Sequence, residues 1–162
     1  MGLSYEAAGK LFRNGEFLQL VKASGRNEDE RKALEPRHRV ILANALAFVG
    51  QIEAAQRLAE IDRHPSLPAA IRAQAESTLA IVSRRSGDHD SAVRHAQSAA
   101  SLAQESNDSE QMAWAHLHLF RLLIEVGPID KVLVALPDVR RSVAKAGTNQ
   151  SSAYLHTCVS VL

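Results

Sequence analysis

The sequence has 162 residues, 46% of them hydrophobic, which is enough for one domain with a sizeable core. A net charge of +1 argues neither for nor against a polyanionic partner, so any electrostatic preference would have to be local. The single cysteine, Cys158, excludes an intrachain disulfide and favours a reducing compartment. Because no signal peptide begins the sequence and no apolar run approaches the ~20 residues that span a bilayer, we expect a soluble, cytoplasmic protein.

Apolar residues recur at steps of three and four along most of the sequence, which is the helical period. A first helical hairpin is expected at about residues 3–23, with Ser4 as a cap. The polar run at residues 24–35 is either a loop or a frayed helix. A second hairpin, at about residues 36–63, begins at Pro36, a residue suited to the first turn of a helix.

The third hairpin, at about residues 67–106, shows the pattern most clearly. Gly87 can adopt the left-handed conformation that ends a helix, and Asp88 can then cap the next one. Small residues, among them Ala80 and Ala92, would let the two helices approach closely. The first of these helices should begin near residues 66–67.

The fourth hairpin, at about residues 108–146, opens with Asp108 and Gln111, the spacing of a capping box. Pro137 lies within its second helix and predicts a kink or a restart, because proline lacks the amide donor and clashes with the preceding turn. An unpaired helix at residues 151–162 completes the chain.

Four turns centred on glycine, at Gly15, Gly50, Gly87 and Gly127, recur at separations of 35, 37 and 40 residues. Each follows an apolar helical run and opens another, as in GQIEAA at 50–55 and GDHDSA at 87–92. We interpret them as four versions of one turn. The arrangement resembles the tetratricopeptide repeat family, whose unit is about 34 residues of helix–turn–helix.

The long and unequal spacing is most similar to the irregular repeats of bacterial signalling and regulator proteins. The resemblance covers nearly the whole chain. It implies that residues 1–162 form one all-α domain, a right-handed solenoid of antiparallel helical hairpins.

In such repeats the first helices of successive hairpins line a concave groove that binds peptides. Through the turn register, the resemblance implies that the groove-facing residues are Tyr5, Phe12, Arg13, Arg37, Val40, Asn44, Phe48, Gln74, Ser77, Ile81, Arg84, Arg85, Trp114, Leu117, Arg121 and Glu125. Five of these are arginines and one is an acid. Arginine can hold a carboxylate by two hydrogen bonds, and Phe48 and Trp114 offer apolar anchors. The resemblance also implies a role for Asn44, because family members that bind a peptide backbone often have an asparagine at this position. The arginines could equally pair with nearby acids.

The sequence therefore predicts a non-enzymatic scaffold for protein–protein interaction, a segment of a larger regulator or adaptor that binds an acidic peptide. One alternative is a sensor that binds a short peptide or small molecule and controls an effector domain outside this chain. Another is a helical repeat that binds nucleic acid, which the near-zero net charge opposes. No catalytic motif appears, and no two histidines have the four-residue spacing that would hold a metal on a helix, so neither a metal nor a cofactor is expected.

The final helix of the prediction has no partner helix. Repeat arrays usually finish with a polar capping helix, so we expect the chain to be a fragment of a longer array. An uncovered apolar face also predicts a homodimer formed through this end. The residues expected to form that contact are Tyr154, Leu155, Val159, Val161 and Leu162.

Overall fold

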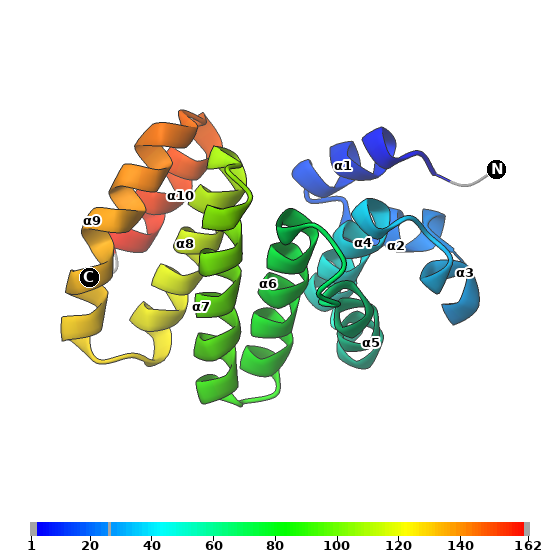
Figure 1. Ribbon diagram of the computed structural model, residues 1–162, viewed down its shortest axis with the longest axis horizontal. Helices are drawn as coiled ribbons and strands as arrows, with labels where there is room; N and C mark the ends of the chain where they lie inside the picture. The colour runs from blue at the N-terminus through cyan, green and yellow to red at the C-terminus, as the bar shows by residue number, and fades with distance from the viewer. Residues whose placement is uncertain (1–2, 26, 161–162) are drawn as a thin grey trace.

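The computed structural model describes residues 3–25 and 27–160, and this part of the chain contains helices and turns but no β-strand. The helices follow one another across the molecule, from the N-terminal helices at one side to the C-terminal pair at the other (Figure 1). They are α1 (Tyr5–Arg13), α2 (Phe17–Ala23), α3 (Glu28–Lys32), α4 (Pro36–Phe48), α5 (Ile52–Asp62), α6 (Ala69–Arg85), α7 (His89–Glu105), α8 (Ser109–Val126), α9 (Ile129–Ala146) and α10 (Asn149–Val159). The all-α class is confirmed.

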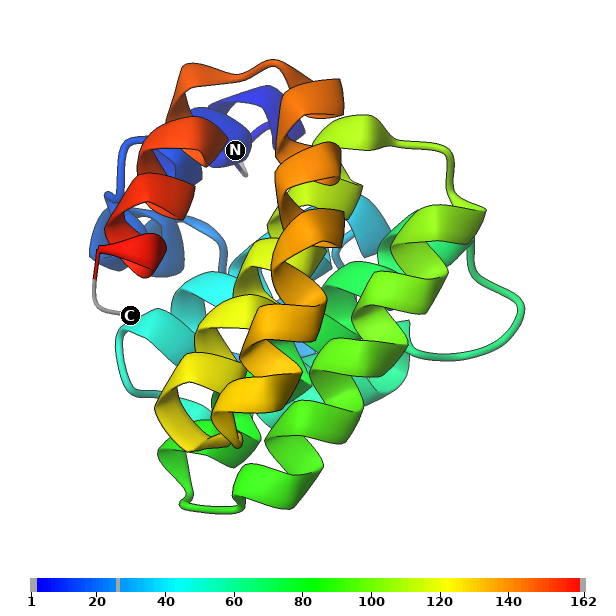
Figure 2. The same ribbon diagram turned by 90° about the vertical axis from the view of Figure 1, so that its left-hand side faces the viewer.

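Contacts join helices that are adjacent along the chain and also helices that are one step further apart. The pairs α4/α5, α6/α7 and α8/α9 make the most extensive contacts. The first helices of successive pairs also meet, with α1 on α4, α4 on α6, α6 on α8 and α8 on α10. Figure 2 looks onto α9 and α10, with the N-terminal helices behind them.

Three of the four predicted glycine turns have the expected backbone conformation. Gly15, Gly50 and Gly87 have φ angles of 76°, 86° and 80°, in the left-handed region that glycine enters without strain. After the third of these, Asp88 Oδ1 accepts a hydrogen bond of 3.0 Å from the Ser91 amide and caps α7. The turn chemistry predicted for the central hairpin is confirmed.

The fourth turn differs from the other three. Gly127 is extended, with φ −93° and ψ 163°, because the following Pro128 disfavours helical geometry in the residue before it. Glycine is required there for space: a Cβ would lie 2.7 Å from the carbonyl oxygen of Leu123. The interpretation of four equivalent turns was therefore wrong at this position.

The capping box predicted at the start of α8 is only half formed. Asp108 Oδ1 accepts a 3.0 Å hydrogen bond from the Gln111 amide, as expected. The side chain of Gln111 does not return to Asp108 but donates to the carbonyl oxygen of Ala70. The glutamine thus ties the start of α8 to the start of α6.

Several predicted helix bounds shift. Helix α6 begins at Ala69 rather than near residues 66–67, since Pro68 is its extended N-terminal cap residue. The polar segment 24–35 contains the short helix α3. Helix α10 begins at Asn149, and Thr148 is its cap.

Pro137 does not restart the helix. Helix α9 runs through it without interruption from Ile129 to Ala146. Both Pro137 and Leu133, whose carbonyl lacks a helical donor there, are exposed. Water can therefore bind the free carbonyl, and the lost hydrogen bond is tolerated.

The apolar core has two large clusters. One lies among α1, α2, α4, α5 and the C-terminal part of α6, and the other among α8, α9 and α10. Their large side chains with almost no exposed surface are Leu20, Leu42, Leu46 and Leu58 in the first and Leu117, Phe120 and Val132 in the second. Burying each such side chain stabilises the fold by about 1.5–3 kcal/mol. No helix in residues 3–25 and 27–160 has the length and apolar character needed to cross a bilayer.

Small side chains fill the centre of the molecule. Ala80, Ala92 and Ala96 are at most 2% exposed and form a cluster between α6, α7 and α8. Their size lets the backbones of α6 and α7 approach closely, as the sequence predicted, and this pair has the most extensive contact in the fold.

A buried ion pair that was not predicted from the sequence joins α4 to α5. The carboxylate of Asp62, with no exposed surface, accepts hydrogen bonds from Arg39 Nε at 2.9 and 3.0 Å and from its Nη2. Arg39 Nη1 also donates to the carbonyl oxygens of Lys32 and Leu34, at 2.8 and 2.9 Å. One guanidinium therefore holds the α3–α4 connection and the end of α5 together.

Candidate functional site

Side chains bridge each successive pair among the first helices α1, α4, α6, α8 and α10. The rings of Phe12 and Phe48 lie 6.3 Å apart between α1 and α4, and Arg85 of α6 donates a 3.2 Å hydrogen bond to the carbonyl oxygen of Phe48. Further contacts, described below, join α6 to α8 and α8 to α10. We name this surface the first-helix face and define it by Phe12, Phe48, Arg84, Arg85, Trp114, His118, Arg121, Glu125 and Tyr154.

The centre of the first-helix face is a cluster of charges. Glu125 accepts a hydrogen bond on one carboxylate oxygen from Arg84 Nη1 at 3.2 Å and on the other from Arg121 Nε at 2.9 Å. The three side chains are 32%, 32% and 50% exposed for Glu125, Arg84 and Arg121. Two cations therefore share one anion at a solvent-accessible position, and these contacts engage only some of their N–H donors.

An aromatic group flanks this cluster on the α10 side. Arg121 Nη1 donates a 2.9 Å hydrogen bond to the hydroxyl of Tyr154. The ring of Tyr154 lies 5.7 Å from that of Trp114, at an interplanar angle of 53°. Trp114 is partly buried in the C-terminal core cluster, so packing holds its ring in place next to Tyr154.

His118 lies between the aromatic group and the arginines. Its ring is 6.2 Å from that of Trp114. Burial, reinforced by the positive charges of Arg121 and Arg84, lowers the pKa of His118 to about 4. The histidine is thus neutral near pH 7, and an added negative charge on this face would raise its pKa.

The other end of the first-helix face is apolar. Phe17 stacks on Phe48 with ring centroids 4.7 Å apart and nearly parallel planes, at 12°. Phe12 meets Phe17 edge-on at 5.2 Å. Phe48 keeps 36% of its surface exposed, which leaves an aromatic side chain accessible next to Arg85.

Three other residues that were predicted to bind a peptide differ in their exposure to solvent. Arg13 and Arg37 are exposed, on α1 and α4. Asn44 is half-buried, and its side-chain amide donates to the carbonyl oxygen of Val40 at 3.3 Å. The asparagine amide is therefore partly occupied within its own helix.

Three residues that the turn register placed in the groove are instead in the core. Val40 and Leu117 have no exposed surface, and Ile81 is 9% exposed. They pack between helices and are not accessible to a partner. Successive residues of a helix point about 100° apart, so an error of one residue in the register moves a side chain from the surface to the interior.

Two members of the face were not predicted to belong to it. His118 belongs to no site predicted from the sequence, and Tyr154 is predicted only for self-association. The spacing of His118 from Trp114, four residues along one helix, could have indicated their shared face.

The C-terminal helix is more covered than the sequence suggested. Tyr154, Leu155 and Val159 are half-buried and pack on the α8/α9 cluster. Val161 and Leu162 lie outside the described residues. Self-association through this helix stays a prediction.

Large exposed apolar side chains occur instead on α9. Ile129, Leu133 and Val134 are 60%, 58% and 78% exposed. They lie in the first half of that helix, and no exposed apolar surface is predicted there from the sequence.

No group of three His, Cys, Asp or Glu side chains in residues 3–25 and 27–160 could hold a metal ion. Cys158 is buried in the C-terminal cluster, and burial raises the pKa of its thiol, which disfavours the reactive thiolate.

Comparison with known proteins gives no assignment: no protein-family model matches the sequence, and no curated protein matches it.

Proposed function

We propose that this protein is a non-enzymatic scaffold of the tetratricopeptide-repeat type, a right-handed solenoid that binds an acidic segment of another protein on the first-helix face. Packing between consecutive hairpins supports the solenoid arrangement. So do the left-handed turns at Gly15, Gly50 and Gly87. Its setting is the cytoplasm, within a larger regulator or adaptor.

The observation that carries the proposal is the cluster in which Arg84 and Arg121 share Glu125. Ion pairs at this exposure contribute at most about 1 kcal/mol, so they can open at little cost. A ligand carboxylate can then bind an arginine by two hydrogen bonds. The excess positive charge favours acidic ligands and disfavours basic ones, and Glu125 competes with any carboxylate that binds the arginines only weakly.

The aromatic residues at the two ends give the ligand apolar contacts in addition. Trp114 and Tyr154 lie on one side of the charge cluster and Phe48 on the other. Aromatic side chains of this kind supply much of the affinity at protein interfaces. The ligand expected is therefore a segment with acidic residues between apolar ones.

The test is binding of fluorescein-labelled peptides of about 12 residues, in which glutamate alternates with leucine, measured by fluorescence anisotropy. Matched peptides carry lysine or serine in place of glutamate. Arg84→Glu combined with Arg121→Glu should abolish binding, because it reverses the charge at the cluster. The control, Lys131→Glu combined with Arg140→Glu, makes the same change in net charge on α9 and should leave the affinity unchanged.

Two outcomes would overturn the proposal. One is equal affinity for the glutamate and lysine peptides, since the face then has no preference for acids. The other is equal loss of affinity in both double variants, which would show a general charge effect. A circular dichroism spectrum of each variant confirms that the helices are retained.

A further inference from the structure

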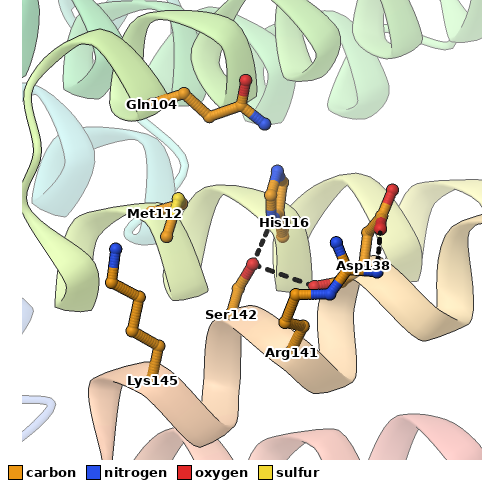
Figure 3. Close-up of a pocket in the computed structure, with 7 residues that line it drawn as sticks. All are labelled: Gln104, Met112, His116, Asp138, Arg141, Ser142 and Lys145. Carbon is orange, nitrogen blue, oxygen red and sulfur yellow. Dashed lines mark hydrogen bonds and ion pairs between the residues drawn. The ribbon is translucent and has the colours of Figure 1, made fainter.

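A second polar site lies on the other side of α8 from the first-helix face. It is a cavity of about 290 Å³ between α7, α8 and α9. Trp114 and His116 are two residues apart on α8, about 200° around its axis, so the first belongs to the first-helix face and the second lines this cavity (Figure 3). A ligand here would not compete with one bound to the first-helix face.

The floor of the cavity is a chain of hydrogen bonds. His116 Nδ1 and the Oγ of Ser142 lie 2.6 Å apart, and Ser142 Oγ is 2.9 Å from the carbonyl oxygen of Asp138. Ser142 is buried and has one hydrogen to donate. When it donates to that carbonyl, as a serine within a helix commonly does, His116 donates from Nδ1 and presents Nε2 to the cavity.

Cationic and amide groups surround the opening. Lys145 and Arg141 extend from α9 and Gln104 from α7, around the ring of His116 (Figure 3). Arg141 is paired with Asp138 at 3.2 Å, but the two side chains are 78% and 67% exposed. Such an exposed pair is weak, so the arginine can turn to a stronger ligand.

We propose that this cavity binds the phosphate group of a small phosphate monoester. The two cations outnumber the one carboxylate, so the site favours an anion. Donors arrive from three helices, around a space large enough for a small phosphate monoester. This arrangement suits a phosphate, whose several oxygens accept in different directions, better than a carboxylate with two.

His116 supplies a pH-sensitive contact to the phosphate. Burial lowers the pKa of His116, although the carboxylate of Asp138 opposes this. The other charged groups at the cavity, Arg141 and Lys145, also favour the neutral ring. A bound phosphate dianion adds negative charge and raises the pKa, so the ring takes up a proton at Nε2 and donates it as a hydrogen bond to a phosphate oxygen.

The experiment is an NMR titration of the imidazole resonances with O-phosphoserine and inorganic phosphate, at constant ionic strength. Acetate and serine are the comparison ligands. His116→Gln assigns the His116 signal. We expect saturable shifts for both phosphate compounds and an increase in the pKa of His116, with neither acetate nor serine reproducing them.

Variants at the opening provide the second measurement. Lys145→Gln should weaken the binding of O-phosphoserine about tenfold, through loss of a charged hydrogen bond. Lys131→Gln, an equal charge change on the same helix outside the cavity, should not. Both positions are exposed, so the fold should survive either change.

Three outcomes would overturn the proposed phosphate site. Shifts of equal size with acetate would mean a general anion effect. Equal weakening by Lys145→Gln and Lys131→Gln would mean long-range attraction only, and an unchanged His116 pKa would place the phosphate elsewhere. Binding of acidic peptides to the first-helix face is unaffected by any of these outcomes, so the two proposals are tested separately.

Discussion

Removal of the Arg39 side chain tests how the N-terminal half of the fold is held. Arg39→Met keeps the aliphatic stem but leaves the carboxylate of Asp62, which has no exposed surface, without its cation. It also removes the donor to the carbonyl oxygens of Lys32 and Leu34. Breaking a buried ion pair in this way lowers the free energy of unfolding by about 3–5 kcal/mol.

The double variant Arg39→Met with Asp62→Leu is the control. It removes the stranded charge, so most of the loss should be recovered, to within about 1–2 kcal/mol of the unmodified protein. Urea unfolding followed by circular dichroism gives both values. A loss below about 1 kcal/mol in Arg39→Met, or a double variant less stable than the single one, would refute the reasoning.

The same variants respond differently to pH. Burial raises the pKa of Asp62 even beside Arg39, so the folded state binds a proton more readily than the unfolded chain. The stability from this group is greatest below its unfolded pKa and declines as pH rises through the folded pKa. Without Arg39 the folded pKa rises further, so Arg39→Met should regain stability on acidification from pH 7 to pH 5, whereas the double variant should not.

Three other results are expected. The pKa of His118 is about 4 in the folded protein and near 6.5 in the unfolded chain, so the free energy of unfolding should fall as pH drops below about 6.5. In urea unfolding, His118→Gln should reduce the stability that is lost between pH 7 and pH 5 by about 1–2 kcal/mol. Identical pH profiles for the variant and the unmodified protein would contradict this. Gly127→Ala should cost about 1–3 kcal/mol in the same assay, because the new Cβ meets the carbonyl oxygen of Leu123 at 2.7 Å, and a neutral effect would show that the turn relaxes freely. Sedimentation should show a concentration-dependent dimer that Val161→Glu abolishes and Val134→Glu leaves intact. Loss of the dimer in Val134→Glu but not in Val161→Glu would show that the two copies meet through the exposed face of α9 instead.

The sequence predicted most of the fold because its local signals were strong. Helical periodicity and the turn glycines located nearly every helix, and the Asp88 cap forms as expected. These predictions failed at two positions where a proline changed the backbone conformation. Pro128 made Gly127 extended rather than left-handed, and Pro68 delayed the start of α6.

Contacts distant in sequence could not be predicted by the same means. Arg39 and Asp62 are 23 residues apart and resemble ordinary surface charges until the fold buries them. The bond from Arg121 to Tyr154 spans 33 residues. Arg121 and Trp114 were expected to face a ligand, and the structure shows them beside Tyr154, which had been assigned to a different role. Helical periodicity predicts which residues share one side of a helix, but not which residues of other helices that side contacts.

The central claim, that an acidic segment binds the first-helix face, is tested most directly by the fluorescence of Trp114, the single tryptophan of the chain. We expect the glutamate–leucine peptide, unlabelled and without tryptophan, to produce a saturable change in that fluorescence. Affinity should weaken with added salt, because exposed charges are screened over about 10 Å at 0.1 M ionic strength. Arg84→Glu combined with Arg121→Glu should remove the change. Peptide binding measured by anisotropy without any response from Trp114, or the same response to the lysine peptide, would contradict the account.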